Sequence, residues 1–99
     1  MKIEYIEKIS ILTFEKVHDL ELIVKEQKTG AGIIFQASFK GTEISEAGMF
    51  LKSAYGVSTT VKVAILDYCR QLSHQKIVVN AFSEARKEIN IPILIYEGE

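Results

Sequence analysis

The sequence predicts an α+β fold, with helices packed on one side of a largely antiparallel sheet. Two patterns support this fold class. Between residues 61 and 72 apolar side chains recur at helical spacing, whereas residues 33–39 alternate apolar and polar as in a half-buried strand. A hydrophobic content of 47% is typical of globular proteins, and 99 residues suit one domain over positions 1–99.

Residues 1–18 are compatible with two structures. Ile3, Ile6 and Ile9 have the spacing of a short helix, whereas Ile9 and Ile11 alternate as in a strand. We expect a strand through roughly residues 9–14, with the helix as the alternative.

The next segment predicts a β-hairpin over about residues 19–40. Residues 20–27 are rich in β-branched side chains, and the two glycines of residues 27–32 can adopt positive φ in a turn. The returning strand places Ile33, Phe35, Ala37 and Phe39 on one face, which we expect to be buried.

Residues 42–53 are interpreted as a third strand, which follows a turn at Lys40-Gly41-Thr42. Gly48 would then mark a bulge or a close backbone approach. The alternative is a helix, in which Gly48 would cost about 1 kcal/mol relative to alanine. We favour the strand because a three-stranded meander would provide a sheet for the helix that follows.

A helix over about residues 58–73 is the clearest element. Gly56 interrupts the preceding segment, and Ser58 or Thr59 is the expected N-cap. The side chains that form its buried stripe are Val61, Ala64, Ile65, Tyr68, Cys69 and Leu72.

The C-terminal quarter is again open to two interpretations. The β-branched run at residues 77–79 favours a short strand followed by a shorter helix over about 82–90. A continuous apolar stripe from about Gln75 favours one longer helix instead. Pro92 disfavours helical geometry at the residue before it, so a terminal strand is expected over 92–97.

The charge balance argues against general nucleic-acid binding. Twelve basic and 13 acidic residues give a net charge of −1, whereas phosphate-backbone binding requires a strongly basic face. A local basic patch formed by Lys25, Lys28, Lys40 and Lys52 supports an alternative function as a nucleic-acid-associated protein.

The residues with reactive side chains do not form a recognisable catalytic or metal-binding motif. The single cysteine, Cys69, lies on the apolar helix stripe and is expected to be a buried structural thiol. On the predicted helix His74 would project about 140° away from it, too far round for a nucleophile–base pair. The spacing of His18, Cys69 and His74 matches no zinc motif, and no phosphate-binding glycine motif occurs. We therefore expect no enzyme activity, no metal and no cofactor.

Composition also suggests a cellular location and an origin. Charged residues near the N-terminus argue against a signal peptide, and no apolar run approaches the roughly 18 residues of a membrane span. We expect a cytoplasmic protein without membrane contact. Many isoleucine, lysine and glutamate residues with few asparagines suggest a thermophile or one of its viruses.

Apolar side chains outside the main stripe predict an interaction surface. Val63 and Leu66 point away from the buried face of the helix, and Ile93 and Ile95 belong to a terminal strand that is apolar on both faces. Arg70 shares one solvent face of the predicted helix with Asp67, three residues before it, and His74, four residues after it. We expect Val63, Leu66, Arg70, Ile93 and Ile95 to contact another molecule, and we predict a homodimer.

The predicted function is that of a small, soluble, non-enzymatic accessory or regulatory protein that acts through protein–protein contacts, with an unidentified protein partner.

Overall fold

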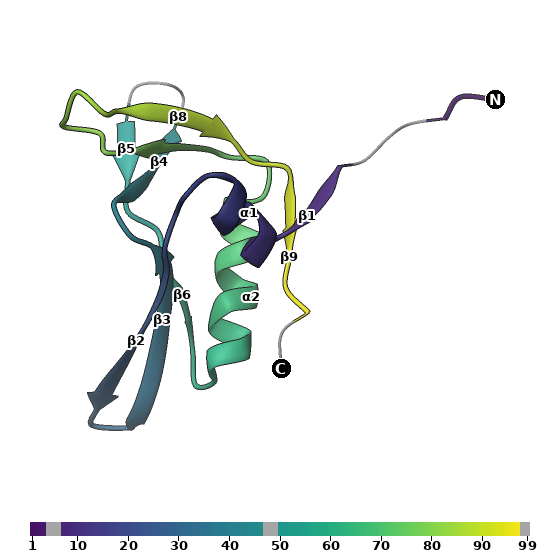
Figure 1. Ribbon diagram of the computed structural model, residues 1–99. Coiled ribbons are helices and arrows are strands. Elements are labelled where there is room, and N and C mark those ends of the chain that lie inside the picture. Colours follow the sequence, from purple (N-terminus) through teal and green to yellow (C-terminus); the bar gives the residue numbers. More distant parts are fainter. Residues whose placement is uncertain (4–6, 47–49, 98–99) are drawn as a thin grey trace.

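The computed structural model describes residues 1–3, 7–46 and 50–97, and it confirms the α+β fold class, with antiparallel sheets and helices (Figure 1). In chain order the elements are β1 (Lys8–Ser10), α1 (Ile11–Val17), β2 (Leu22–Thr29), β3 (Gly32–Phe39), β4 (Thr42–Glu46), β5 (Phe50–Lys52), β6 (Gly56–Ser58), α2 (Val61–Leu72), β7 (Lys76–Val79), β8 (Lys87–Asn90) and β9 (Ile93–Ile95).

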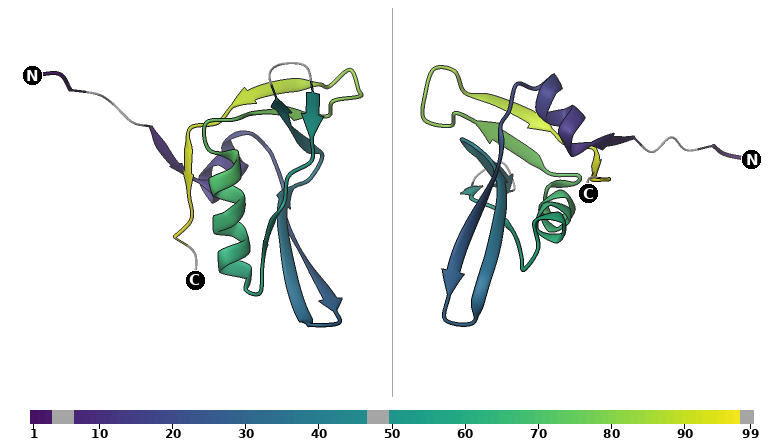
Figure 2. Two further views of the ribbon diagram at one scale, coloured as in Figure 1. Left: turned by 180° about the vertical axis from the view of Figure 1, so that it is seen from behind. Right: turned by 60° about the horizontal axis from the view of Figure 1, so that its bottom comes forward.

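The strands form three small sheets around α2. Strands β2, β3 and β6 make an antiparallel sheet, β5, β4, β7 and β8 make a second antiparallel sheet, and β1 pairs with β9 in parallel. Figures 1 and 2 show α2 between the β2–β3–β6 sheet and the β1–β9 pair, with the four-stranded sheet across one end of the helix. The central helix is therefore covered on several sides by strands.

The predicted hairpin is confirmed. Strands β2 and β3 pair along their full length, from Leu22 opposite Phe39 to Thr29 opposite Gly32. Of the two turn glycines, Gly32 has φ +132°, a backbone conformation that other residues rarely adopt. Gly30 does not have a positive φ of this kind. The core face of β3 is buried at Ala37 and Phe39, but Ile33, near the tip, is exposed.

The predicted helix is confirmed, but it begins later than expected. Residues 56–58 form β6, and the N-cap is Thr60 rather than Ser58 or Thr59, with the Thr60 hydroxyl accepting from Val63 N–H at 3.2 Å. Val61, in the first turn, is exposed, whereas the remaining five residues of the predicted stripe are buried.

Gly56 allows α2 to lie directly against β6. A Cβ atom at this position would lie 1.9 Å from the carbonyl oxygen of Ala64 and 2.5 Å from the backbone nitrogen of Tyr68. Any larger residue would therefore overlap the helix backbone. Glycine sets the distance between helix and sheet here.

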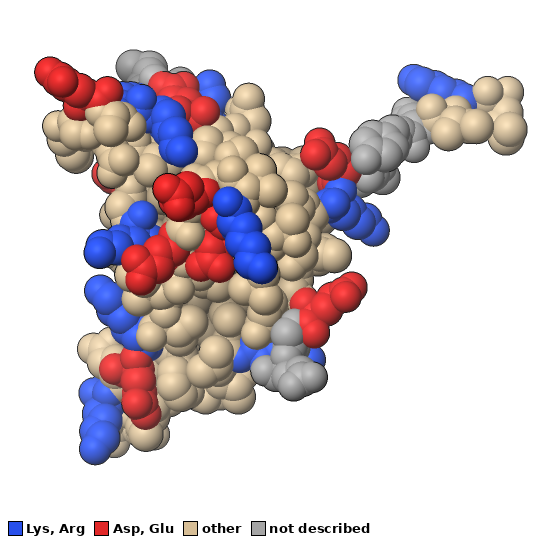
Figure 3. Space-filling model, viewed as in Figure 1, with Lys and Arg blue, Asp and Glu red and all other residues tan. Residues whose placement is uncertain are grey.

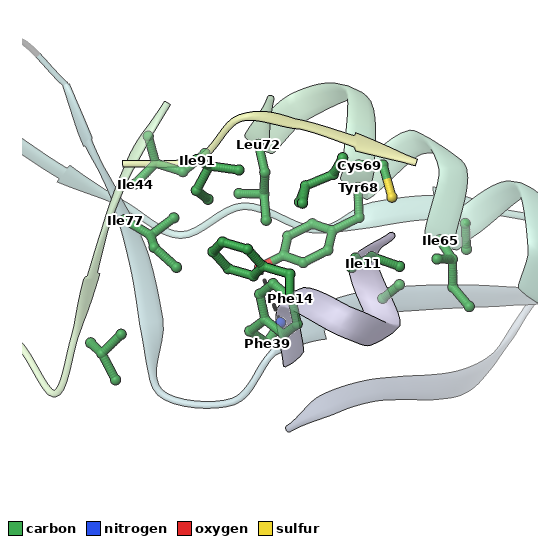
Figure 4. Close-up of a cluster of buried hydrophobic side chains, with 14 residues drawn as sticks. Ile11, Phe14, Phe39, Ile44, Ile65, Tyr68, Cys69, Leu72, Ile77 and Ile91 are labelled. Carbon is green, nitrogen blue, oxygen red and sulfur yellow. Dashed lines mark hydrogen bonds between the residues drawn. The ribbon is translucent and has the colours of Figure 1, made fainter. Parts of the chain in front are cut away.

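The main core is aromatic at its centre (Figure 4). The rings of Phe39 and Tyr68 meet edge to face with centroids 5.6 Å apart, and the ring of Phe14 lies 6.0 Å from that of Phe39. The β3–β6 pairing ends at Ala37, and two residues later the N–H of Phe39 donates to Tyr68 Oη at 3.0 Å. The tyrosine hydroxyl thus satisfies a buried backbone donor beyond the end of the β3–β6 pairing.

The expected strand over residues 9–14 is wrong. Only Lys8–Ser10 are extended, and Ser10 then caps α1 by accepting from Leu12 N–H at 3.3 Å. Ile11 and Phe14, three residues apart, are both buried on the inner side of α1. The alternation of Ile9 and Ile11 that suggested a strand instead spans the junction between β1 and α1.

The single third strand over 42–53 is also corrected. The segment contains two strands, β4 and β5, which pair with each other, and β4 also pairs with β7. They belong to the four-stranded sheet, so the third strand beside the hairpin is β6 instead. Gly48, the expected bulge, lies outside the described residues.

After α2 the strand interpretation is confirmed for β7, but the helix over 82–90 is wrong. Residues 80–86 form turns, and Lys87–Asn90 form β8 antiparallel to β7. Asn80 turns the chain with φ +55°, and Ile89 in β8 packs against the core. The tertiary pairing with β7 overrides the apolar periodicity that suggested a helix.

The terminal strand is shorter than predicted, at Ile93–Ile95, and it pairs with β1 in parallel. Ser73, which follows α2, connects it to the helix. The Ser73 hydroxyl donates to the carbonyl of Cys69 at 2.7 Å and accepts from Leu94 N–H at 3.0 Å. The position of β9 beside α2 is thereby fixed by a hydrogen bond as well as by packing.

Candidate functional site

The outer side of α2 carries three of the five residues predicted to interact. Val63, Leu66 and Arg70 follow one another at i, i+3 and i+7, so they form one stripe opposite the buried face. Val63 is 48% exposed and Leu66 is 38% exposed. We call Val63, Leu66 and Arg70 the outer stripe of α2.

The other two predicted residues lie on the neighbouring strand β9. Leu94 points into the core, and strand alternation therefore directs Ile93 and Ile95 to the opposite face, where both are half-buried. Because β9 lies alongside α2 (Figure 1), the structure places all five residues on two adjacent elements.

A hydrogen-bonded carboxylate fixes α2 relative to β6. Asp67 accepts from the N–H of Val57 at 3.1 Å, from Arg70 at 2.5 Å and from Gln71 Nε2 at 3.0 Å. Gln71 Nε2 also donates to the carbonyl of Tyr55 at 2.7 Å. The hydrogen bond from Arg70 is the main reason that the pKa of Asp67 is lowered.

The predicted grouping of Asp67, Arg70 and His74 on one helix face is therefore only partly correct. Asp67 and Arg70 form an ion pair, but the helix ends at Leu72 and His74 adopts φ +65° beyond it. The backbone N–H of His74 donates to the carbonyl of Ile91 at 3.0 Å. This residue belongs to the connection with β7.

Cys69 is buried, as predicted for a structural thiol. Its side chain is packed in the core, and burial raises the pKa of the thiol to about 11. A protonated thiol is a poor nucleophile at neutral pH. The His18 ring packs against that of Phe14 at a tilt of 45°, with centroids 4.3 Å apart, and it lines a hollow of about 420 Å³ to which Cys69 does not contribute.

The four lysines proposed as a basic patch do not share one surface. Lys25 and Lys28 lie three residues apart on β2, so strand alternation directs them to opposite faces. Lys52 lies 3.7 Å from Glu46 in an ion pair. Only Lys25 and Lys40 line a common groove.

This groove has a volume of about 620 Å³, compared with about 420 Å³ for the hollow beside His18. It lies between the open face of the β2–β3 hairpin and the β7–β8 connection, and residues 53–55 form part of its wall. Its most notable side chains are Lys25, Lys40, Glu43, Tyr55 and Phe82. Its lining mixes polar and charged side chains with aromatic ones, and a concave surface with such a mixture can bind a ligand.

The sequence did not indicate this groove. Phe82 falls in the helix expected over 82–90, which does not form, and Tyr55 falls in the segment before α2. The exposure of both aromatic side chains, 91% for Phe82 and 47% for Tyr55, follows only from the fold. Figure 3 shows positive and negative side chains interspersed on the face that carries α1 and β2, without a separate basic surface.

Neither a membrane span nor a metal site emerges from the described part of the chain. None of its helices is long and apolar enough to cross a bilayer. Nor do three or more His, Cys, Asp or Glu side chains within residues 1–3, 7–46 and 50–97 come together as metal ligands. Comparison with protein-family models, curated proteins and solved structures finds no match to this chain.

Proposed function

We propose that this protein is a non-enzymatic accessory or regulatory protein that acts through protein–protein contacts, and that the outer stripe of α2 joins two copies of it. The observation that carries the proposal is the exposure of Val63 and Leu66 on a helix next to β9. Ile93 and Ile95 on β9 add two half-buried apolar side chains to the same region. Apolar side chains on adjacent elements are typical of contact surfaces.

The rigidity of this surface supports its role in binding. Asp67 ties α2 to β6, and the Ser73 hydroxyl ties the end of α2 to β9. A surface whose elements are already fixed loses little conformational entropy when a partner docks. A two-fold pairing would bring the apolar residues of one stripe against those of the other. A reducing intracellular location is part of this proposal, because the single thiol is buried and unpaired.

Light scattering and sedimentation velocity of the purified protein test the proposed dimer. We expect a concentration-dependent dimer for the native sequence and a monomer for Leu66→Glu, which places a charge in the apolar contact. Gln27→Glu is the matched control, because it adds the same charge at an exposed position of the hairpin. A native protein that stays monomeric at high concentration would contradict the proposal.

Retention on immobilised DNA and RNA separates this function from the nucleic-acid alternative. Because the four lysines do not form one surface, we expect no retention at about 0.2 M salt, where only a multi-phosphate contact persists. Retention above that concentration would favour the nucleic-acid function instead.

A further inference from the structure

The groove between the hairpin and the β7–β8 connection is separate from the outer stripe of α2, and none of the residues that line it belongs to that stripe. We propose that this groove binds a short acidic segment of a partner protein that carries an aromatic or large apolar side chain. The inference rests on the proposed protein-binding function but concerns a second surface.

The charges of the groove favour an anionic ligand. Lys25 on β2 and Lys40 in the turn after β3 both line it, and neither forms an ion pair with any residue that the structure describes. Glu43 is the only acidic side chain among the described lining residues, so the two lysines leave a net positive charge. The whole chain, in contrast, has a net charge of −1. Acidic groups would therefore be attracted to the groove and not to the surface in general.

The aromatic side chains favour an apolar group beside the acidic ones. Phe82 is 91% exposed although phenylalanine is usually buried, and Tyr55 lies on the wall of the same groove. The position of Phe82 is held by a structured turn. Asn80 N–H donates to the carbonyl of Gly41 at 3.1 Å, and Ser83 N–H donates to the carbonyl of Asn80 at 3.1 Å. An aromatic side chain from a partner would bury both rings and gain ring–ring contacts.

The same groups argue against a nucleic-acid strand as the ligand. Glu43 would face the phosphates of a strand laid along the groove, and Lys28 and Lys52 do not extend the positive surface. A nucleic-acid strand presents one charge per nucleotide and requires several aligned cations. Two lysines near two exposed aromatic side chains suit an acidic peptide instead.

Binding of a labelled random copolymer of glutamate and tyrosine, measured by fluorescence anisotropy, tests the proposal. We expect Lys40→Glu to weaken binding at least tenfold, because it replaces attraction with repulsion. Phe82→Ala should weaken it about fivefold through the lost aromatic contact. The matched controls are Lys28→Glu, on the opposite face of β2, and Phe50→Ala, an exposed phenylalanine that does not line the groove. Both controls should bind within twofold of the native protein.

Three results would overturn the groove proposal: no binding of the copolymer, equal loss in the control variants, or tighter binding of a single-stranded oligothymidylate. Polyglutamate without tyrosine should bind at least fivefold more weakly than the copolymer, and equal binding would also refute the aromatic contact. Light scattering on the same samples separates the two proposals. A native protein that is dimeric but does not bind the copolymer refutes the groove alone, whereas a native protein that is monomeric but binds the copolymer refutes only the dimer.

Discussion

Replacing Gly56 with alanine tests how closely α2 is packed against β6. The added Cβ would lie 1.9 Å from the carbonyl oxygen of Ala64, whereas ordinary contacts begin at 3.4 Å, so helix or strand must move by about 1.5 Å (3.4 − 1.9). Overpacking costs about 2–3 kcal/mol, and disturbing the hydrogen bonds from Val57 and Gln71 adds about 1 kcal/mol. Alanine also lowers the entropy of the unfolded chain, which offsets about 0.5–1 kcal/mol of this destabilisation. We expect a net loss of about 3 kcal/mol.

Urea unfolding followed by circular dichroism measures this loss. A net destabilisation of about 3 kcal/mol should also lower the Tm by roughly 12–24 °C in a domain of this size. Gly30→Ala is the matched control, since its Cβ would meet no atom within 4 Å and its φ is not in the left-handed region. The reasoning is refuted if Gly56→Ala is as stable as Gly30→Ala.

Three further substitutions or treatments test the core and the carboxylate. Tyr68→Phe removes the acceptor of the buried Phe39 N–H, and urea unfolding should show a loss of about 1–3 kcal/mol; no change would mean that this N–H finds another partner. Because folding lowers the pKa of Asp67 from its ordinary value of 3.8, the ionised carboxylate contributes fully to stability above pH 3.8. This contribution is lost as the pH falls through the pKa that Asp67 has in the folded protein. Asp67→Asn should therefore be less stable than the native protein at pH 6, and the difference should narrow as the pH falls below 3.8, as read from urea midpoints; a constant difference would contradict this assignment. Because burial raises the pKa of Cys69 to about 11, an aromatic disulfide reagent at pH 8 should modify the thiol only after unfolding, and rapid modification of the native protein would show that the thiol is accessible.

The elements that local pattern predicted correctly are those in which one face is buried along consecutive turns or pleats. The α2 stripe and the β2–β3 hairpin are of this kind, because a helix period or a strand alternation is visible within the segment itself. The helix expected over 82–90 failed for the opposite reason. Its apolar residues are few, and the decisive contact is the pairing of β8 with β7.

Of the two candidate surfaces, the outer stripe of α2 is visible in local sequence pattern, whereas the groove is not. The outer stripe of α2 follows from helix geometry, so Val63, Leu66 and Arg70 could be grouped from the sequence alone. The groove could not be predicted, because it joins segments that are distant in the chain and depends on the β4–β7 pairing. The hydrogen bond from Val57 to Asp67 was likewise invisible, since neither residue has a periodicity that indicates it.

The parallel pairing of β1 with β9 has a consequence for how the chain reaches its native state during synthesis. Lys8 lies opposite Ile93, so the first strand has no partner until almost the whole described chain has left the ribosome. Contacts between such distant segments slow folding, because the entropy of closing a long loop is lost before the stabilising contacts form. Ile9 and the rest of β1 thus stay without their strand partner until residues 93–95 have been synthesised.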